Sequence, residues 1–161
     1  MLQAIGSAKR CIYLQTPYFL PTEALLKALQ TAALSGVDVR LMMPRQSDSA
    51  MLRHASYSYV TECLKAGIKV YLYTAGMLHS KVLIVDDDLS SVGSTNFDFR
   101  SFEHNYEANI FIYSAHTNAR LKQIFHDDIK HSMQCDISQW LARPTAQRMV
   151  DSLVRLFSPI L

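Results

Sequence analysis

Hydrophobic positions along the chain follow two spacings, which predict β-strands and α-helices in turn. Apolar-rich runs at Cys11–Gln15, Val37–Met43 and Ile68–Tyr73 are typical of buried strands. Between these runs, apolar residues recur at helical spacing after Thr22 and after Asp48, and each helical segment closes at a glycine. Repeated strand–helix–strand units favour parallel strands with helices on the faces of a sheet.

The second half of the chain predicts strands that follow one another more closely. Val82–Val85 is typical of a buried strand, Leu89–Val92 of its partner beyond an acidic turn, and Tyr106–Tyr113 of a later strand. Two further amphipathic helices have apolar stripes formed by Leu121, Ile124, Phe125, Ile129 and Met133, and by Ala146, Met149, Val150, Leu153 and Phe157. We therefore predict an α/β fold with a mixed β-sheet flanked by helices.

The composition is that of one folded globular domain. The 161 residues are 49% hydrophobic and 19% charged, and the formal charge of +2 is too small to indicate nucleic acid or an anionic membrane by itself. Cys11, Cys63 and Cys135 lack the short spacing of a zinc or redox site, so we expect buried, reduced thiols. No stretch approaches the roughly 20 apolar residues that span a bilayer.

The segment from His79 to Asn96 carries the candidate chemistry. If the strand begins at His79, alternation places His79 and Lys81 on one face, where an imidazole can attack an electrophile and an ammonium can neutralise its anionic oxygen. This pairing suits a phosphate ester. Ser94 and Asn96 offer further donors, and Gly93 allows close backbone approach to a ligand, so the group could hold phosphate without a metal.

The same residues match a known pattern, HxK, four residues, D, six residues and GSxN, which identifies the chain as a member of the phospholipase D superfamily. The fixed positions are His79, Lys81, Asp86, Gly93, Ser94 and Asn96. Residues 14–29, 36–44 and 96–113 also resemble the C-terminal half of bacterial cardiolipin synthases. The resemblance implies that residues 1–161 form a single phospholipase D-like domain, the C-terminal catalytic half of a two-half enzyme.

The resemblance also implies roles for the site residues. His79 is one of two histidines that act on the substrate phosphorus, one as nucleophile and the other as proton donor to the leaving alcohol. Lys81 and Asn96 bind phosphate oxygens, with Ser94 as a supporting donor, and Glu107 orients the histidine by accepting its other ring N–H. Asp86 belongs to the catalytic motif, but strand alternation points it away from His79, so we interpret it as a structural residue of the turn. No metal or cofactor is expected, and the acidic turn at Asp87 and Asp88 is interpreted as solvated.

The chain contains one copy of the pattern, because none of the other five histidines has the same context. A second half is therefore expected, either from a longer chain or from a homodimer mate. The implied function is cardiolipin synthesis from two phosphatidylglycerol molecules, with release of glycerol through a phosphohistidine, at the bacterial cytoplasmic membrane. The alternatives are a phosphodiesterase or nuclease active as a homodimer, and a non-catalytic half. Nucleic acid is not the expected partner.

Two segments keep two interpretations each. The last helix carries Arg143, Arg148 and Arg155 near its apolar stripe, so it either packs on the domain or lies on an anionic membrane surface. The loop after the first strand contains Tyr18 and Phe19, which either contact substrate or pack within the domain.

Overall fold

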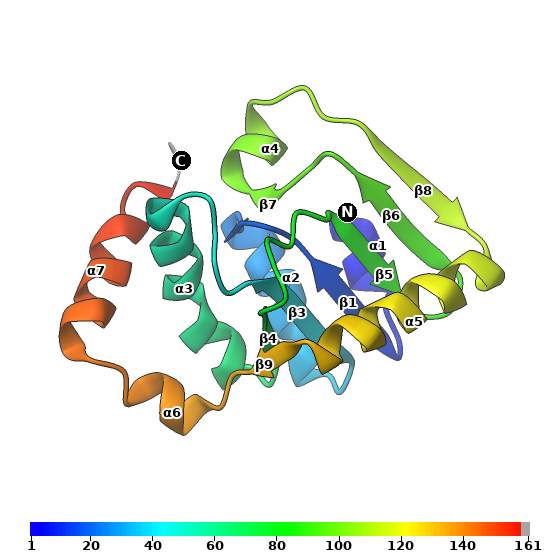
Figure 1. Cartoon of the computed structure of the whole chain (residues 1–161). Helices are drawn as coiled ribbons and strands as arrows, with labels where there is room; N and C mark the ends of the chain where they lie inside the picture. The colour runs from blue at the N-terminus through cyan, green and yellow to red at the C-terminus, as the bar shows by residue number, and fades with distance from the viewer. Residues whose placement is uncertain (159–161) are drawn as a thin grey trace.

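A computed structural model describes residues 1–158 as a seven-stranded sheet with helices on both faces (Figure 1). The strands are β1 (Cys11–Gln15), β2 (Phe19–Leu20), β3 (Asp38–Pro44), β4 (Lys69–Tyr73), β5 (Val82–Val85), β6 (Leu89–Gly93), β7 (Phe97–Asp98), β8 (Asn109–Tyr113) and β9 (Ser132–Gln134). The helices are α1 (Leu2–Ser7), α2 (Glu23–Leu34), α3 (Ala50–Lys65), α4 (Phe99–Glu103), α5 (Ala115–Lys130), α6 (Ile137–Leu141) and α7 (Thr145–Arg155). The predicted α/β class is confirmed.

The sheet has the order β8-β6-β5-β1-β3-β4-β9 and is mixed, as the sequence predicts. Strands β1, β3 and β4 are parallel, because helical crossovers connect them, whereas β5, β6 and β8 run antiparallel to their neighbours. The short strands β2 and β7 form a separate parallel pair. Central β1 therefore lies where the parallel and antiparallel halves of the sheet meet.

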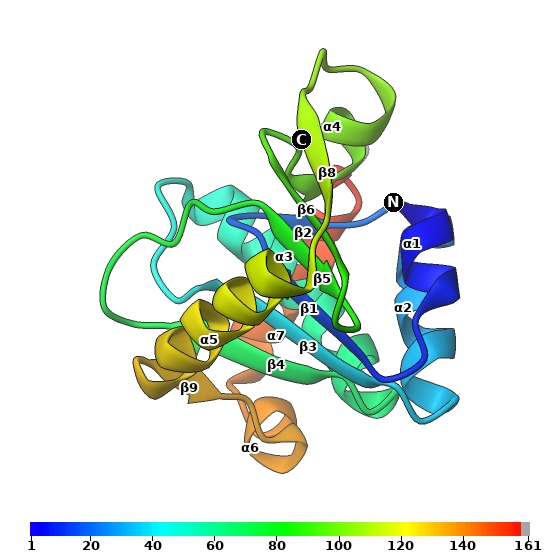
Figure 2. The ribbon, with the colours of Figure 1, turned by 90° about the vertical axis from the view of Figure 1, so that its right-hand side faces the viewer.

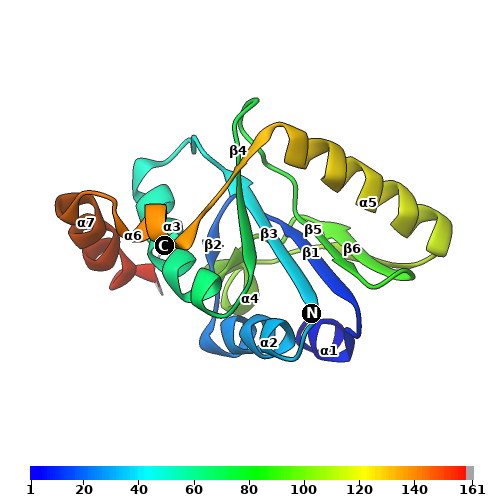
Figure 3. The ribbon, with the colours of Figure 1, turned by 90° about the horizontal axis from the view of Figure 1, so that it is seen from below.

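Two apolar layers hold the helices to the sheet (Figure 3). On one face, α2 and α3 pack on alternate residues of the central strands, such as Leu14 and Leu41. On the other face, α5 packs through Phe125, whose ring stacks on Tyr13 with centroids 4.9 Å apart. The three cysteines are buried and free, as expected. Within residues 1–158, no helix has both the length and the apolar character needed to cross a bilayer.

Local signals set both ends of α2 and the start of α3 where the sequence predicts them. The Thr22 hydroxyl accepts the backbone N–H of Leu25 and begins α2, and the Ser49 hydroxyl accepts that of Leu52 and begins α3. After α2 the chain turns through Gly36 at a φ of 91°, a left-handed conformation that glycine adopts without strain.

Strand β5 has the predicted bounds, Val82–Val85, and His79 and Lys81 precede it, so the condition that the strand begins at His79 is not met. Two predicted boundaries are wrong. Strand β8 starts at Asn109, where pairing with Gly93 begins, so Glu107 precedes that strand. Helix α5 ends at Lys130, and Met133 lies in β9 opposite Leu72. The short helix α1 was not predicted, and Phe19, assigned to a loop, is a fully buried residue of β2.

The antiparallel end of the sheet is the most open part of the fold. Figure 2 shows β8 and α4 projecting from the rest of the domain, with α1 across from them. Strand β8 is at the sheet edge, and Ile110, Phe111 and Tyr113 are 69%, 44% and 78% exposed. An exposed apolar edge strand is a typical surface for association with further protein.

Candidate functional site

The His79–Lys81 segment lies at one end of the central strands, where β1 ends and β5 begins. Val82 pairs with Gln15, the last residue of β1, so the segment leading into β5 lies beside the carboxyl end of β1. The Lys81 ammonium is 2.9 Å from Nδ1 of His79 and donates to the His79 carbonyl oxygen at 2.7 Å. His79 is exposed and Lys81 is partly buried, so the imidazole is accessible and the cation beside it is held in place.

The Lys81 ammonium lies closer to Nδ1 of His79, at 2.9 Å, than to Nε2, at 3.5 Å. An ammonium has only donors, so Nδ1 of His79 accepts, and a neutral imidazole then carries its proton on Nε2. For Nε2 to attack phosphorus, the imidazole must carry its proton on Nδ1 instead. The Nδ1–H group would then donate to an acceptor other than Lys81.

Ser94 and Asn96 follow the last residue of β6, at the same end of the sheet. The Ser94 hydroxyl donates to the Glu107 carboxylate and accepts the backbone N–H of Ala108 at 3.0 Å, so it joins the end of β6 to the start of β8. The side-chain oxygen of Asn96 is buried, and within residues 1–158 it has no hydrogen-bond partner. This oxygen accepts hydrogen bonds, so a phosphate oxygen would have to be bound by the amide N–H groups of the same side chain.

Gly93 is required by the sheet itself. A Cβ added to Gly93 would lie 2.7 Å from Cα of Asn109 and still closer to the Ala108 carbonyl oxygen. The close approach expected toward a ligand is thus an approach to the neighbouring strand, and it brings Ser94 within reach of Glu107.

Glu107 faces the site, with a partner that differs from the expected one. It accepts from Ser94 and from Asn105, whereas the implied hydrogen bond to His79 is not formed in this copy. The Ser94 hydrogen bond, followed by that of Asn105, lowers the pKa of Glu107, so the carboxylate is ionised at neutral pH. Burial lowers the pKa of Lys81, and the charge of Glu107 opposes that shift.

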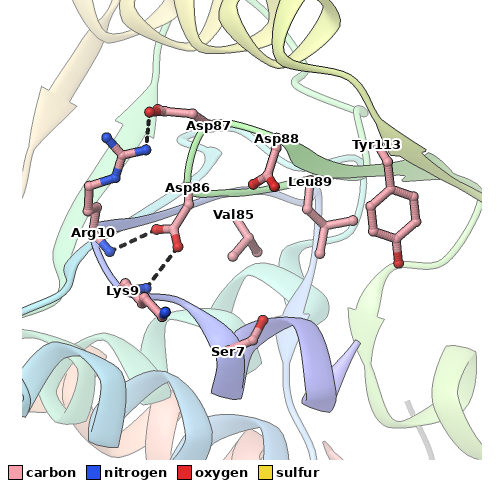
Figure 4. Close-up of a pocket in the computed structure, with 9 residues that line it drawn as sticks. All are labelled: Ser7, Lys9, Arg10, Val85, Asp86, Asp87, Asp88, Leu89 and Tyr113. Carbon is pink, nitrogen blue, oxygen red and sulfur yellow. Dashed lines mark hydrogen bonds and ion pairs between the residues drawn. The ribbon is translucent and has the colours of Figure 1, made fainter.

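Asp86 lies at the opposite end of β5 from Lys81 and contacts the backbone of the N-terminal segment. Its carboxylate accepts the N–H groups of Lys9, Arg10 and Cys11 at 2.8–2.9 Å, and Figure 4 shows the first two of these hydrogen bonds. Burial opposes its ionisation, but these hydrogen bonds outweigh burial and lower the pKa of Asp86. The pocket in Figure 4 has a volume of about 770 Å³ and lies beside this turn, apart from His79.

The structure adds two residues to the site. The Tyr18 ring meets the His79 ring edge-on, with centroids 6.3 Å apart, and its hydroxyl donates to Asp48 at 2.7 Å. Burial and this hydrogen bond raise the pKa of Tyr18 to about 12. The aromatic loop signalled Tyr18 as one of two interpretations, but no sequence signal marked Asp48, which reaches the site only through loop packing.

Comparison with known proteins places this geometry in a family. Residues 1–129 match the model of "Cardiolipin synthase, PLD-like domain". The chain belongs to this family. Its relatives include a cardiolipin synthase of Geobacillus thermodenitrificans and cardiolipin synthase 2 of Bacillus anthracis, each 46% identical over 98% of the chain. The chain spans about a third of these relatives, 31% and 30% of their lengths.

Solved structures show the same fold. A phospholipase D family member, Nuc, from Salmonella typhimurium superposes with a TM-score of 0.72 at 25% identity, covering 83% of the chain and 87% of Nuc. Phosphatidylserine synthase of Haemophilus influenzae superposes with a TM-score of 0.78 at 17% identity, covering 99% of the chain and 44% of the synthase. Both superpositions agree with a phospholipase D-like domain.

Proposed function

We propose that the chain supplies one half of a phosphatidyltransferase site that makes cardiolipin from two phosphatidylglycerol molecules and releases glycerol. The observation that carries the proposal is the accessible His79 imidazole beside the Lys81 ammonium. Ser94, Asn96 and Glu107 lie at the same end of the sheet. The cardiolipin synthase relatives supply the lipid substrate of the proposal.

The proposed reaction has two steps. One imidazole of the complete site attacks the phosphorus of phosphatidylglycerol, and the P–O bond to glycerol breaks while the second imidazolium gives its proton to the leaving oxygen. That second imidazole, now neutral, takes a proton from a hydroxyl of another phosphatidylglycerol. The hydroxyl oxygen attacks the phosphatidyl-histidine, forms cardiolipin and frees the first imidazole. His79 is one member of this pair, and the sequence pattern alone does not assign which.

In this proposal the other side chains stabilise charge and geometry. Lys81 and Asn96 bind the non-bridging phosphate oxygens, on which negative charge grows as phosphorus becomes five-coordinate. Glu107 accepts an imidazole N–H in the complete site, which requires its carboxylate to release the hydrogen bond from the Ser94 hydroxyl. Asp86 acts on the fold rather than on substrate, because its carboxylate is occupied by three backbone N–H groups.

We further propose that a second half brings the second imidazole. The exposed apolar residues of β8 lie next to Glu107 and are the surface that this half would cover. Because the chain covers a third of its relatives, the second half is proposed to come from the preceding part of a longer chain, with a homodimer mate as the competing source.

The test is a transferase assay on phosphatidylglycerol vesicles, run with the chain alone and with the missing half added. We expect cardiolipin only with both halves, and loss of turnover in His79→Ala. If His79 is the nucleophile, the phosphohistidine trapped by a rapid denaturing quench is also lost in this variant. His116→Ala is the matched control, because His116 is exposed on α5 away from the site. Unchanged turnover in His79→Ala would refute the proposal. Hydrolysis of bis(p-nitrophenyl) phosphate by a dimer of this chain, without lipid transfer, would instead support the phosphodiesterase alternative.

A further inference from the structure

Helix α7 packs on the domain through its polar side. Asp151 is 3% exposed, and its carboxylate binds Nδ1 of His54 on α3 at 2.7 Å and the Arg143 guanidinium at 3.0 Å. One turn later, Arg155 pairs with Glu62 of α3. These contacts place charged groups, and not the apolar stripe, between α7 and α3.

The apolar stripe of α7 consequently points away from the domain. The exposed fractions are 60% for Met149, 42% for Val150, 58% for Leu153, 75% for Leu156 and 53% for Phe157. We call these five residues the outer face of α7. The helix packs on the domain, but not through this stripe, because the buried Asp151 and its two partners fix the helix in the opposite rotation. A continuous apolar face of this kind marks a surface that a membrane or another molecule covers.

The position of α7 separates it from the surface proposed for the second half. Helix α7 and strand β8 lie at opposite ends of the molecule in Figure 1, and Figure 3 shows α7 at the far side of the sheet from β6. A half that completes the site beside Glu107 and covers β8 leaves the outer face of α7 free. The outer face thus needs an occupant of its own.

The charges around α7 favour an anionic occupant. A cavity of about 350 Å³ on the polar side of the helix is lined by Arg45, Arg53 and Arg143 together with His54 and the buried Asp151. Arg148 lies exposed on α7 itself and donates to the Leu141 carbonyl oxygen at 3.2 Å. Within residues 1–158, Arg45, Arg53 and Arg148 form no ion pair. Asp151, the one carboxylate that α7 contains, is buried and already paired.

We infer that the outer face of α7 is a membrane-docking surface that inserts among the acyl chains of an anionic bilayer, while the neighbouring arginines bind lipid phosphates. A helix with one apolar face and with arginines on its polar side is the composition that holds a helix in the interface plane. The docking goes beyond the proposed transfer reaction and does not require it, because the outer face lies apart from His79. It would hold the half-site at the surface where lipid substrates lie.

The direct test uses a single introduced thiol. The three native cysteines are buried, so Leu153→Cys provides the accessible site for an environment-sensitive fluorophore. Leu34→Cys on α2 is the matched control, because Leu34 is also an exposed helical leucine, at 74%. With vesicles of phosphatidylglycerol and phosphatidylcholine, we expect a blue shift of emission at position 153 and none at 34. Equal shifts at both positions, or no shift at 153, would overturn the inference.

A second experiment measures binding without a label. Leu153→Glu should weaken vesicle co-sedimentation at least about tenfold, because a leucine side chain no longer leaves water, whereas Leu34→Glu should bind like the wild type. Arg148→Gln should weaken binding to anionic vesicles only, and salt should weaken the wild type. His79→Ala should bind vesicles normally, so failure of the transfer proposal and failure of docking are distinguishable. If Leu153→Glu instead disrupts a dimer of this chain and leaves vesicle binding intact, the outer face is a protein interface and docking is wrong.

Discussion

The Asp86 carboxylate accepts the backbone N–H groups of Arg10 at 2.8 Å and Cys11 at 2.9 Å, although 76 and 75 residues separate them in the chain. These hydrogen bonds fasten the first residue of the central strand β1 to the turn between β5 and β6. A fixed position of the phospholipase D pattern therefore holds together the two strands whose other ends carry the candidate site.

Asp86→Asn should destabilise the fold by about 1–3 kcal/mol, because the amide offers one acceptor oxygen where the carboxylate offers two and a charge. The backbone is not a complication: Asp86 has a φ of 49°, which asparagine also tolerates. Urea unfolding of the variant measures the loss, and Asp88→Asn, at an exposed neighbour in the same turn, should leave stability unchanged. Unchanged stability of Asp86→Asn together with lost phosphate affinity would assign Asp86 to the site instead.

The effect of Asp86→Asn should depend on pH. The pKa of Asp86 is lowered in the folded state, so the carboxylate contributes stability above its unfolded value of about 3.9 and loses that contribution as pH falls through the lower, folded value. The difference between wild type and variant in the free energy of unfolding should therefore be constant near neutrality and shrink below about pH 4. A difference that stays constant down to pH 2 would show that ionisation of Asp86 contributes nothing.

Most of the sheet and the long helices could be predicted from the sequence, because buried strands and amphipathic helices leave strong local patterns. Residues 11–15 and 82–85 are recovered at their correct bounds as β1 and β5. Helix α1 was missed because six residues carry little periodic signal. Met133 was placed in the preceding helix because its spacing continues the stripe, and only pairing with Leu72 shows that it belongs to a strand.

Relationships between distant elements escaped prediction. Strand alternation predicted that Asp86 points away from His79, but the backbone partners of Asp86 at Lys9, Arg10 and Cys11 were not foreseen. The apolar stripe of α7 was identified, and its outward direction was not, because that direction depends on the buried contact between Asp151 and His54. The candidate residues were named from their spacing, while their contacts, such as that between Glu107 and Ser94, depend on how β6 and β8 pair.

Gly93→Ala should be among the most damaging single-methyl changes in this chain. The added Cβ meets backbone atoms of Ala108 and Asn109, which cannot rotate away, so β6 and β8 must separate. We expect a loss of about 2–4 kcal/mol, measured by urea unfolding. Gly6→Ala is the matched control: a Cβ there meets nothing within 4 Å, and alanine in helix α1 should stabilise by about 0.5–1 kcal/mol. Equal effects of the two variants would contradict the close approach of β6 and β8.

Glu107→Gln should lower the pKa of Lys81 further. Burial already lowers that pKa, and Glu107 is foremost among the carboxylates that oppose the shift, ahead of Asp98 and Asp48. Removing its charge leaves the ammonium less stabilised, so Lys81 should lose its proton at a lower pH in the variant than in the wild type. The ¹³Cε resonance of Lys81, followed through an alkaline titration, measures the change directly.

The same change should appear in ligand binding. Because Lys81 binds phosphate only as the ammonium, affinity for inorganic phosphate should decline at a lower pH in Glu107→Gln than in the wild type. Glu103→Gln, at an exposed position of the preceding helix α4, should leave both the Lys81 titration and the phosphate profile in place. If Glu107→Gln moves neither, the carboxylate acts through Ser94 and the strand pairing alone, and its electrostatic coupling to Lys81 is wrong.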